Sequence, residues 1–244
     1  MSSTLAVNDW LRNYRPETRL PGFSRRNDLR DQRLRRRLGL FPMNTTQPPL
    51  RVSENEVFWA EIAPTEHIVH LYADDLAFLE MLEGFAVMGL LAGEGVVVIG
   101  TEAHIFDLNR RLDAWGIDLR SARESDQYLA LSAETILARF MVGGCPDEER
   151  FNKVVTDLIE RAGRGGRQVR ACNELAAILW QTGQNEATVR LEHLWNELRR
   201  TRRFALFCSY PKAGFTLHSL EALEEICAAH TKVISNHSRH SAWP

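Results

Sequence analysis

Short apolar runs alternate with stretches of helical periodicity over most of this chain. The run Gly95–Gly100 reads GVVVIG, and such continuous β-branched character is typical of a strand that is buried on both faces. Around residues 76–90, by contrast, apolar side chains recur every three or four positions, which predicts a helix. Apolar runs predict strands at 67–72, 95–100, 128–131, 167–172 and 204–210. Helical periodicity predicts helices at about 76–90, 101–116, 132–141, 146–162, 173–180, 186–200 and 219–229.

This alternation predicts an α/β fold with a mostly parallel sheet that carries helices on both faces. In such folds, ligands bind beyond the carboxyl ends of the strands. The tyrosines could form apolar walls with polar tips, and the other polar residues could orient a ligand. The candidate ligand-binding residues are His67, Tyr72, Asp74, Thr101, Glu102, Asn173, Glu174 and Tyr210.

Glu102 and Glu174 also have a simpler interpretation. Each follows a predicted strand and lies at the start of a predicted helix. A carboxylate there interacts favourably with the amino end of the helix, with or without a ligand. The sequence leaves both readings open.

The first 50 residues form a segment of different composition. Residues 1–51 contain 11 Arg, no Lys and four acidic residues, whereas the whole chain has a net charge of -2. Sparse apolar residues and several prolines predict a disordered extension that is either simply solvated or a basic arm. Translation that begins at Met43 is an alternative. We expect one folded domain at 51–235 and a flexible tail at 236–244.

Several familiar motifs are missing from the sequence. It has no phosphate-binding G-x-x-x-x-G-K-S/T loop, no G-x-G-x-x-G dinucleotide motif and no G-x-S-x-G nucleophile motif. His67 and His70 are three apart on a predicted strand and therefore point to opposite faces, and Glu192 and His193 are neighbours on a helix. We therefore predict a protein that is not an enzyme and has no metal site and no cofactor.

Cysteine spacing and hydropathy together indicate where in the cell the protein is expected. The four cysteines are widely spaced without a C-x-x-C pair, which is typical of small buried side chains in a cytosolic protein. No apolar run approaches the roughly 18 residues of a membrane helix, and no signal-peptide core is present. We expect a cytoplasmic protein that does not enter a membrane.

The segments that follow residue 66 resemble the MEDS family, the sensory domain named for methanogens, methylotrophs and the repressor DcmR. No single segment is specific, but their order and spacing together carry the resemblance. The matching segments are HIVHLY (67–72), FAVMGLLAGE (85–94), VVVIGTEAH (96–104), WGIDL (115–119), GCPDEERF (144–151), RACNEL (170–175), LEHLWNEL (191–198) and FALFCSYP (204–211).

The resemblance implies a RecA/KaiC-like fold and a sensory role for the domain at 51–235. MEDS domains are similar to KaiC and RecA ATPases, and Glu102 matches a position that a catalytic glutamate occupies in KaiC-like enzymes. Here Tyr72-Ala-Asp-Asp75 stands where those enzymes have the phosphate-binding loop, which implies an ATPase frame without its chemistry. MEDS domains occur with histidine kinases and helix-turn-helix regulators and are thought to respond to small organic compounds.

These observations favour a non-catalytic sensory domain that binds a small organic ligand and signals to a partner, such as a histidine kinase or a transcription regulator. The main alternative is a ligand-free adaptor or an oligomeric scaffold, because RecA-like domains often self-assemble. A residual nucleotide binder and a DNA-associated regulator are further alternatives. Nucleic acid is expected as a partner only through the Arg-rich extension.

Overall fold

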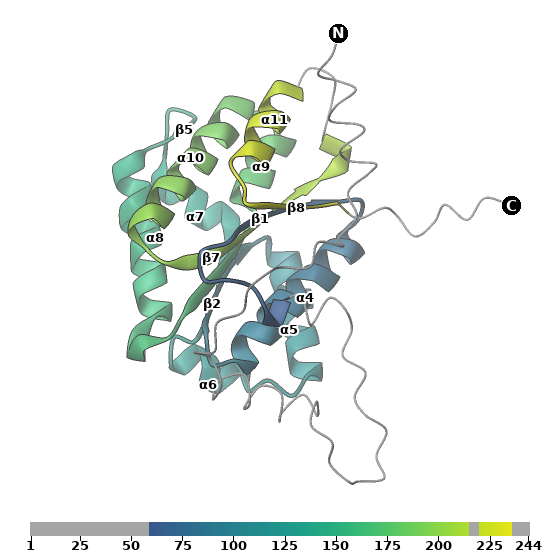
Figure 1. Cartoon of the computed structure of the whole chain (residues 1–244), viewed down its shortest axis with the longest axis vertical. Coiled ribbons are helices and arrows are strands. Elements are labelled where there is room, and N and C mark those ends of the chain that lie inside the picture. Colours follow the sequence, from purple (N-terminus) through teal and green to yellow (C-terminus); the bar gives the residue numbers. More distant parts are fainter. Residues whose placement is uncertain (1–58, 215–219, 236–244) are drawn as a thin grey trace, which may run out of the picture.

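A six-stranded parallel sheet forms the centre of the computed structural model, which describes residues 59–214 and 220–235 (Figure 1). Its strands are β1 (His67–Tyr72), β2 (Gly95–Gly100), β3 (Tyr128–Ser132), β6 (Val169–Asn173), β7 (Phe204–Pro211) and β8 (Lys232–Ser235). They lie in the order β3-β2-β6-β7-β1-β8, and each neighbouring pair is parallel. The carboxyl ends of all six strands therefore lie at one edge of the sheet.

Helices cover both faces of the sheet (Figure 1). The helices are α4 (Asp75–Leu91), α5 (Glu102–Ala114), α6 (Leu119–Glu124), α7 (Ala133–Phe140), α8 (Glu148–Ala162), α9 (Leu175–Gln181), α10 (Asn185–Thr201) and α11 (Leu220–Ala228). Side chains of α4, α5 and α6 pack with Ile68 and Val98 on one face. Side chains of α7 to α11 pack with Val69 and Val97 on the other. Successive strand residues thus enter two separate cores, which explains the continuous apolar runs.

Polar residues at the ends of the strands begin the helices. The Asp74 carboxylate accepts a hydrogen bond from Ala77 N at 2.9 Å, and Thr101 Oγ1 accepts one from His104 N at 3.2 Å. These bonds satisfy backbone donors that the first helical turn leaves free. Strand ends and helix starts therefore meet at the carboxyl edge of the sheet.

The predicted α/β class with a mostly parallel sheet is confirmed, but several short elements were not predicted. They are β8, α6 and an antiparallel hairpin of β4 (Met141–Val142) and β5 (Cys145–Pro146), with the 3-10 turns η1 (Arg164–Gly166) and η2 (Lys212–Gly214). The strand β8 has only four residues, so its sequence carries little periodic signal, and β1 is its one partner among the described strands. The predictions for residues 1–50 and 236–244 lie outside the described residues. Within the described part, no helix is long and apolar enough to cross a membrane.

A buried arginine joins the first helical layer to the sheet. Arg170 on β6 is 2% exposed, and its Nε donates to Glu94 Oε2 at 2.5 Å. Its Nη1 donates to the carbonyl oxygens of Trp59 and Phe85 at 3.2 and 3.0 Å. A buried guanidinium is tolerated only when its charge and its donors are matched in this way.

We predict that Glu94→Ala strongly destabilises the fold, because it leaves the Arg170 charge buried without its carboxylate. Removal of one partner of a buried pair costs about 3–5 kcal/mol. Urea unfolding followed by circular dichroism measures the change in the free energy of unfolding. The control is Glu124→Ala, which breaks the exposed pair between Arg120 and Glu124 and should leave stability nearly unchanged. Equal effects of the two substitutions would contradict a structural role for the buried pair.

Candidate functional site

A buried carboxylate and a histidine meet at the carboxyl edge of the sheet. Glu174 Oε2 lies 2.7 Å from His104 Nδ1, and Glu174 Oε1 accepts a hydrogen bond from Thr101 N at 3.3 Å. The Glu174 side chain is only 5% exposed and that of His104 is 14% exposed. We refer to Glu174, His104 and Thr101 as the strand-end site.

The backbone around β2 and β6 is shaped to admit this carboxylate. Glu174 follows β6 directly, and its N–H donates to Ile99 O of the neighbouring strand at 2.9 Å. A Cβ atom at Gly100 would lie 2.5 Å from Glu174 Oε1, so a larger residue there would displace the carboxylate. The absence of a side chain at Gly100 thus allows Glu174 to reach the amino end of α5.

The charge of Glu174 alters the protonation of His104. Burial alone would lower the pKa of His104, but its hydrogen bond to Glu174 and the negative charges of Glu174, Asp75 and Asp107 raise the pKa above 6.5. The other ring nitrogen, Nε2, is 3.8 Å from the Asp75 carboxylate, which is longer than a hydrogen bond. The imidazole therefore presents a second polar atom at this edge of the sheet.

The other candidates near this edge have different surroundings. Asp74 is exposed and begins α4, and Glu102 is exposed on the first turn of α5. Tyr72 is buried, and its ring stacks on that of Phe78 with centroids 5.1 Å apart. Phe78 in turn lies 4.9 Å from the His104 ring. Tyr72 is therefore linked to the strand-end site through Phe78, which lies between its ring and that of His104.

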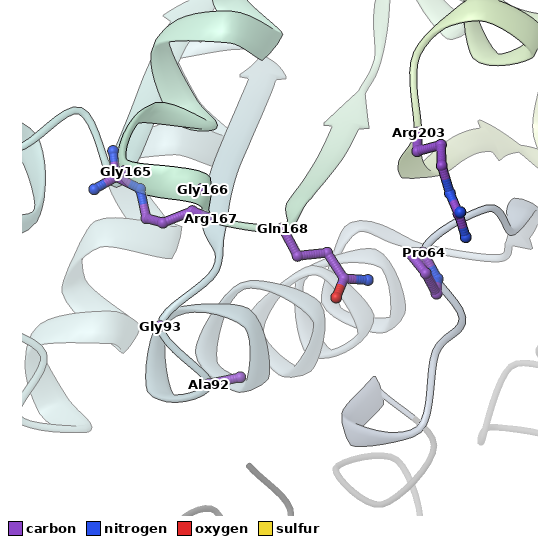
Figure 2. A pocket seen from close by; sticks show the side chains of 8 residues that line it. All are labelled: Pro64, Ala92, Gly93, Gly165, Gly166, Arg167, Gln168 and Arg203. Carbon is purple, nitrogen blue, oxygen red and sulfur yellow. The ribbon is translucent and has the colours of Figure 1, made fainter. Parts of the chain in front are cut away.

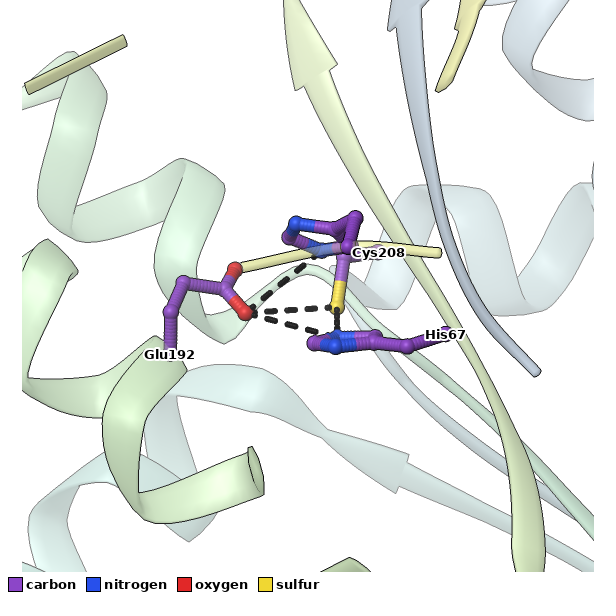
Figure 3. A group of neighbouring side chains, drawn as sticks. His67, Glu192 and Cys208 are labelled. Carbon is purple, nitrogen blue, oxygen red and sulfur yellow. Dashed lines mark hydrogen bonds and ion pairs between the residues drawn. The ribbon is translucent and has the colours of Figure 1, made fainter. Parts of the chain in front are cut away.

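The remaining three candidates lie on the opposite face of the sheet. His67, Asn173 and Tyr210 contact a buried polar cluster that also contains Glu192, Cys208 and His230. Figure 3 shows three of these side chains converging between the strands and a helix. His67 belongs to β1, Cys208 to β7, Glu192 to α10, and His230 to the turn between α11 and β8. The eight candidates thus divide between two places, so they do not form a single pocket.

We define the buried quartet as His67, Glu192, Cys208 and His230. Each contributes one atom able to bind a metal, and these four atoms lie within 4.8 Å of one another. Burial lowers the pKa of His67 well below its usual value and that of His230 to about 4. Burial also raises the pKa of Glu192 to about 7 and that of the Cys208 thiol well above its usual value. The positive charge of Arg199 also acts on these groups, but burial has the larger effect on each pKa, so the cluster disfavours charge.

Sequence reasoning missed His104, Glu192, Cys208 and His230 as site residues. His104 could have been found, because it lies one helical turn after the Thr101 cap. Glu192 was considered only beside its neighbour His193, which the structure places on the exposed side of α10. The quartet comes from four separate elements, so no local spacing reveals it.

An open pocket of about 660 Å³ lies at the opposite, amino-terminal edge of the sheet (Figure 2). Its lining residues are Pro64, Ala92, Gly93, Gly165, Gly166, Arg167, Gln168 and Arg203. Arg167 already donates hydrogen bonds to the carbonyl oxygens of Ala162 and Ser125, both at 2.8 Å. No candidate ligand-binding residue lines this pocket.

Comparisons with known proteins identify a family. The model of the MEthanogen/methylotroph, DcmR Sensory domain (MEDS) matches residues 66–231. A solved structure, from a structural study of a Pyrococcus horikoshii OT3 protein, is 13% identical to this chain. The match covers 76% of this chain and 89% of that chain with a TM-score of 0.46, which is too low to support an inference. No curated protein matches the sequence.

We predict that the pKa of His104 falls in Glu174→Gln, because the neutral amide no longer stabilises the imidazolium. Titration of the ring by NMR measures the shift. In the wild type, the raised pKa means that protonated His104 stabilises the fold below pH 6.5, and this contribution is lost as the pH rises through the folded-state pKa. Glu102→Gln, which removes a nearby exposed acid, is the control and should have little effect. An unchanged His104 titration in Glu174→Gln would refute the pairing.

Proposed function

Since the chain belongs to the MEDS family of sensory domains, we propose that it binds a small organic ligand at the strand-end site and signals to a partner protein. The protein acts without catalysis, in the cytoplasm, and its partner is a histidine kinase, a transcription regulator or another signalling protein. The relationship to KaiC and RecA ATPases stays a prediction.

The buried pair of Glu174 and His104 is the observation that carries this proposal. Glu174 is only 5% exposed, and its pairing with His104 and Thr101 N offsets the cost of that burial. The pair lies where ligands of parallel α/β folds bind. A ligand with a hydroxyl or amine could bond to His104 Nε2 and to the exposed carboxylates of Asp74 or Glu102. Tyr72 and Phe78 supply an aromatic base beneath the pair.

The loop after β1 supports a role other than nucleotide hydrolysis. Asp74 occupies the amino end of α4, where a phosphate-binding loop would present backbone N–H groups and a lysine. Both Asp74 and Asp75 would repel a triphosphate. A residual nucleotide binder therefore remains a minor alternative.

Exposed apolar side chains favour a protein partner. Leu76 on α4 is 59% exposed and Phe106 on α5 is 64% exposed, and these two helices pack together beside the strand-end site. Such side chains are suited to contact another protein or a second copy of this chain. They also support the second candidate function, a ligand-free adaptor or oligomeric scaffold.

We predict that protein purified from its own host carries a small organic molecule that native mass spectrometry detects. The expected extra mass is on the order of a few hundred daltons, which is typical of molecules held in such sites. In Glu174→Gln, the bound fraction should fall roughly tenfold or more, because His104 loses the charge-assisted hydrogen bond that orients its imidazole toward the ligand. The protein should release the molecule on denaturation.

The matched control is Glu186→Gln, which removes an acid at the start of α10 and should leave the bound fraction unchanged. Equal retention in Glu174→Gln and the wild type would contradict the strand-end location. A chain that carries only copies of itself would favour the adaptor over the sensor.

A further inference from the structure

The donor atoms of the buried quartet point at a common centre. His67 Nε2 lies 3.5 Å and His230 Nε2 lies 3.6 Å from the same oxygen, Glu192 Oε2. The Cys208 sulfur is 3.4 Å from His67 Nε2 and 3.8 Å from Glu192 Oε2. The side chains of both histidines are fully buried, and that of Glu192 is 1% exposed.

Carbonyl oxygens fix the tautomers of both histidines. His67 Nδ1 lies 3.0 Å from Asn196 Oδ1 and 3.1 Å from Ala229 O, and His230 Nδ1 lies 2.6 Å from Ile226 O. A carbonyl oxygen only accepts hydrogen bonds, so each Nδ1 carries the proton. In a neutral imidazole, Nε2 then has a free lone pair. Both lone pairs face the interior of the quartet.

The quartet is poorly arranged as a network of hydrogen bonds. The two imidazole nitrogens and an ionised Glu192 are all acceptors, and the distances of 3.5 and 3.6 Å are too long even for a protonated Glu192. The Cys208 thiol can donate a hydrogen bond to His67 Nε2, but His230 Nε2 has no hydrogen-bond partner among the described residues. A buried nitrogen without a partner needs an explanation.

A metal ion provides that explanation. With metal–ligand distances of 2.0 to 2.3 Å, the donor atoms of a tetrahedral zinc site lie about 3.3–3.6 Å apart. Four of the donor separations within the quartet, 3.4 to 3.8 Å, are close to this range, and all four donor atoms lie within 4.8 Å of one another. We propose that His67, Glu192, Cys208 and His230 bind one divalent transition-metal ion, Zn²⁺ or an ion of similar preference, in a closed tetrahedral site.

The donor set determines the class of ion. Two imidazole nitrogens, a thiolate and a carboxylate suit Zn²⁺ and related ions, whereas Mg²⁺ and Ca²⁺ prefer oxygen ligands alone. A divalent ion also balances the two negative charges of a thiolate and a carboxylate, so burial of all four groups becomes favourable. Four protein ligands leave no open position, which is typical of a structural or regulatory site rather than a catalytic one.

Each ligand is held by a second residue. Asn173 Nδ2 donates to Cys208 Sγ at 3.2 Å, and the Tyr210 hydroxyl donates to Glu192 Oε1, the oxygen that faces away from the histidines. The two backbone carbonyls orient the imidazoles. Such outer contacts are characteristic of metal sites, because they fix the direction and the protonation of the ligands. Asn173 and Tyr210, which the sequence predicts as ligand-binding residues, therefore position the metal ligands Cys208 and Glu192.

The ion would join the carboxyl-terminal elements to the core. His230 lies between α11 and β8, while the other three ligands belong to β1, β7 and α10. Among the described strands, β8 pairs only with β1 and lies at the end of the strand order. Metal occupancy is therefore expected to control how firmly α11 and β8 are held.

We predict that the full-length protein, stripped with a chelator, binds one Zn²⁺ per chain in a titration read by elemental analysis after gel filtration. The Co²⁺ form should show the visible bands of tetrahedral cobalt and a thiolate-to-cobalt charge-transfer band. In Cys208→Ser, the charge-transfer band should vanish and the affinity should fall by more than about 100-fold, because a ligand is lost. Tyr210→Phe should keep the stoichiometry and weaken binding about 10- to 100-fold.

The chain offers matched controls for two ligands. Cys172 is as deeply buried as Cys208 but enters the opposite face of the sheet, so Cys172→Ser should leave the metal content unchanged. His70 is a buried histidine on the same strand as His67, and His70→Gln is the control for His67→Gln. Glu174→Gln at the strand-end site should also bind Zn²⁺ normally, which separates this test from that of the organic ligand.

Two outcomes would overturn the proposal. One is the absence of saturable Zn²⁺ or Co²⁺ binding by the stripped wild-type protein. The other is binding that lacks the charge-transfer band and persists unchanged in His67→Gln and Cys208→Ser, which would indicate adventitious surface sites. If Cys208→Ser fails to fold, the cobalt spectrum of the wild type and the affinity of Tyr210→Phe decide the question.

Discussion

Burial of the parallel sheet on both faces is the constraint on which the rest of the structure depends. Residues of β1, β2 and β6 enter one core or the other, so most of their positions are apolar. A polar side chain placed there loses contact with water and must find a partner inside the protein. Arg170 meets this requirement with Glu94 and two carbonyl groups. The polar residues that enter the sheet are therefore informative about function.

The two clusters of polar residues meet the same constraint in different ways. At the strand-end site, Glu174 is paired with His104 and with the amino end of α5, and the His104 side chain is 14% exposed. The buried quartet is closed to solvent, and its donors face one another. The first arrangement suits a ligand that arrives and leaves, and the second suits an ion that stays bound. A sensory domain can use both, with one to detect and the other to maintain the fold.

The sequence predicted much of the fold but only part of the sites. Apolar runs such as GVVVIG revealed the central strands, because burial on both faces leaves a continuous signal. β8 was missed, because an edge strand of four residues depends on its partner β1 rather than on its own pattern. Thr101 and Glu174 were predicted at the strand ends from general rules of α/β folds. The quartet could not be predicted, since it exists only through the parallel register of β1 and β7 and the packing of α10 and α11.

The final residues of β6 connect the two clusters through a single peptide unit. Asn173 turns to one face of the sheet and bonds to Cys208, while Glu174 turns to the other and bonds to His104. The alternation that separates the two cores therefore also places the two clusters back to back. The N–H of this peptide unit, which belongs to Glu174, is bonded to Ile99 O of the neighbouring strand, so a displacement there would affect the contacts of both clusters. The ordinary pleat of a strand thus links the two clusters across the sheet.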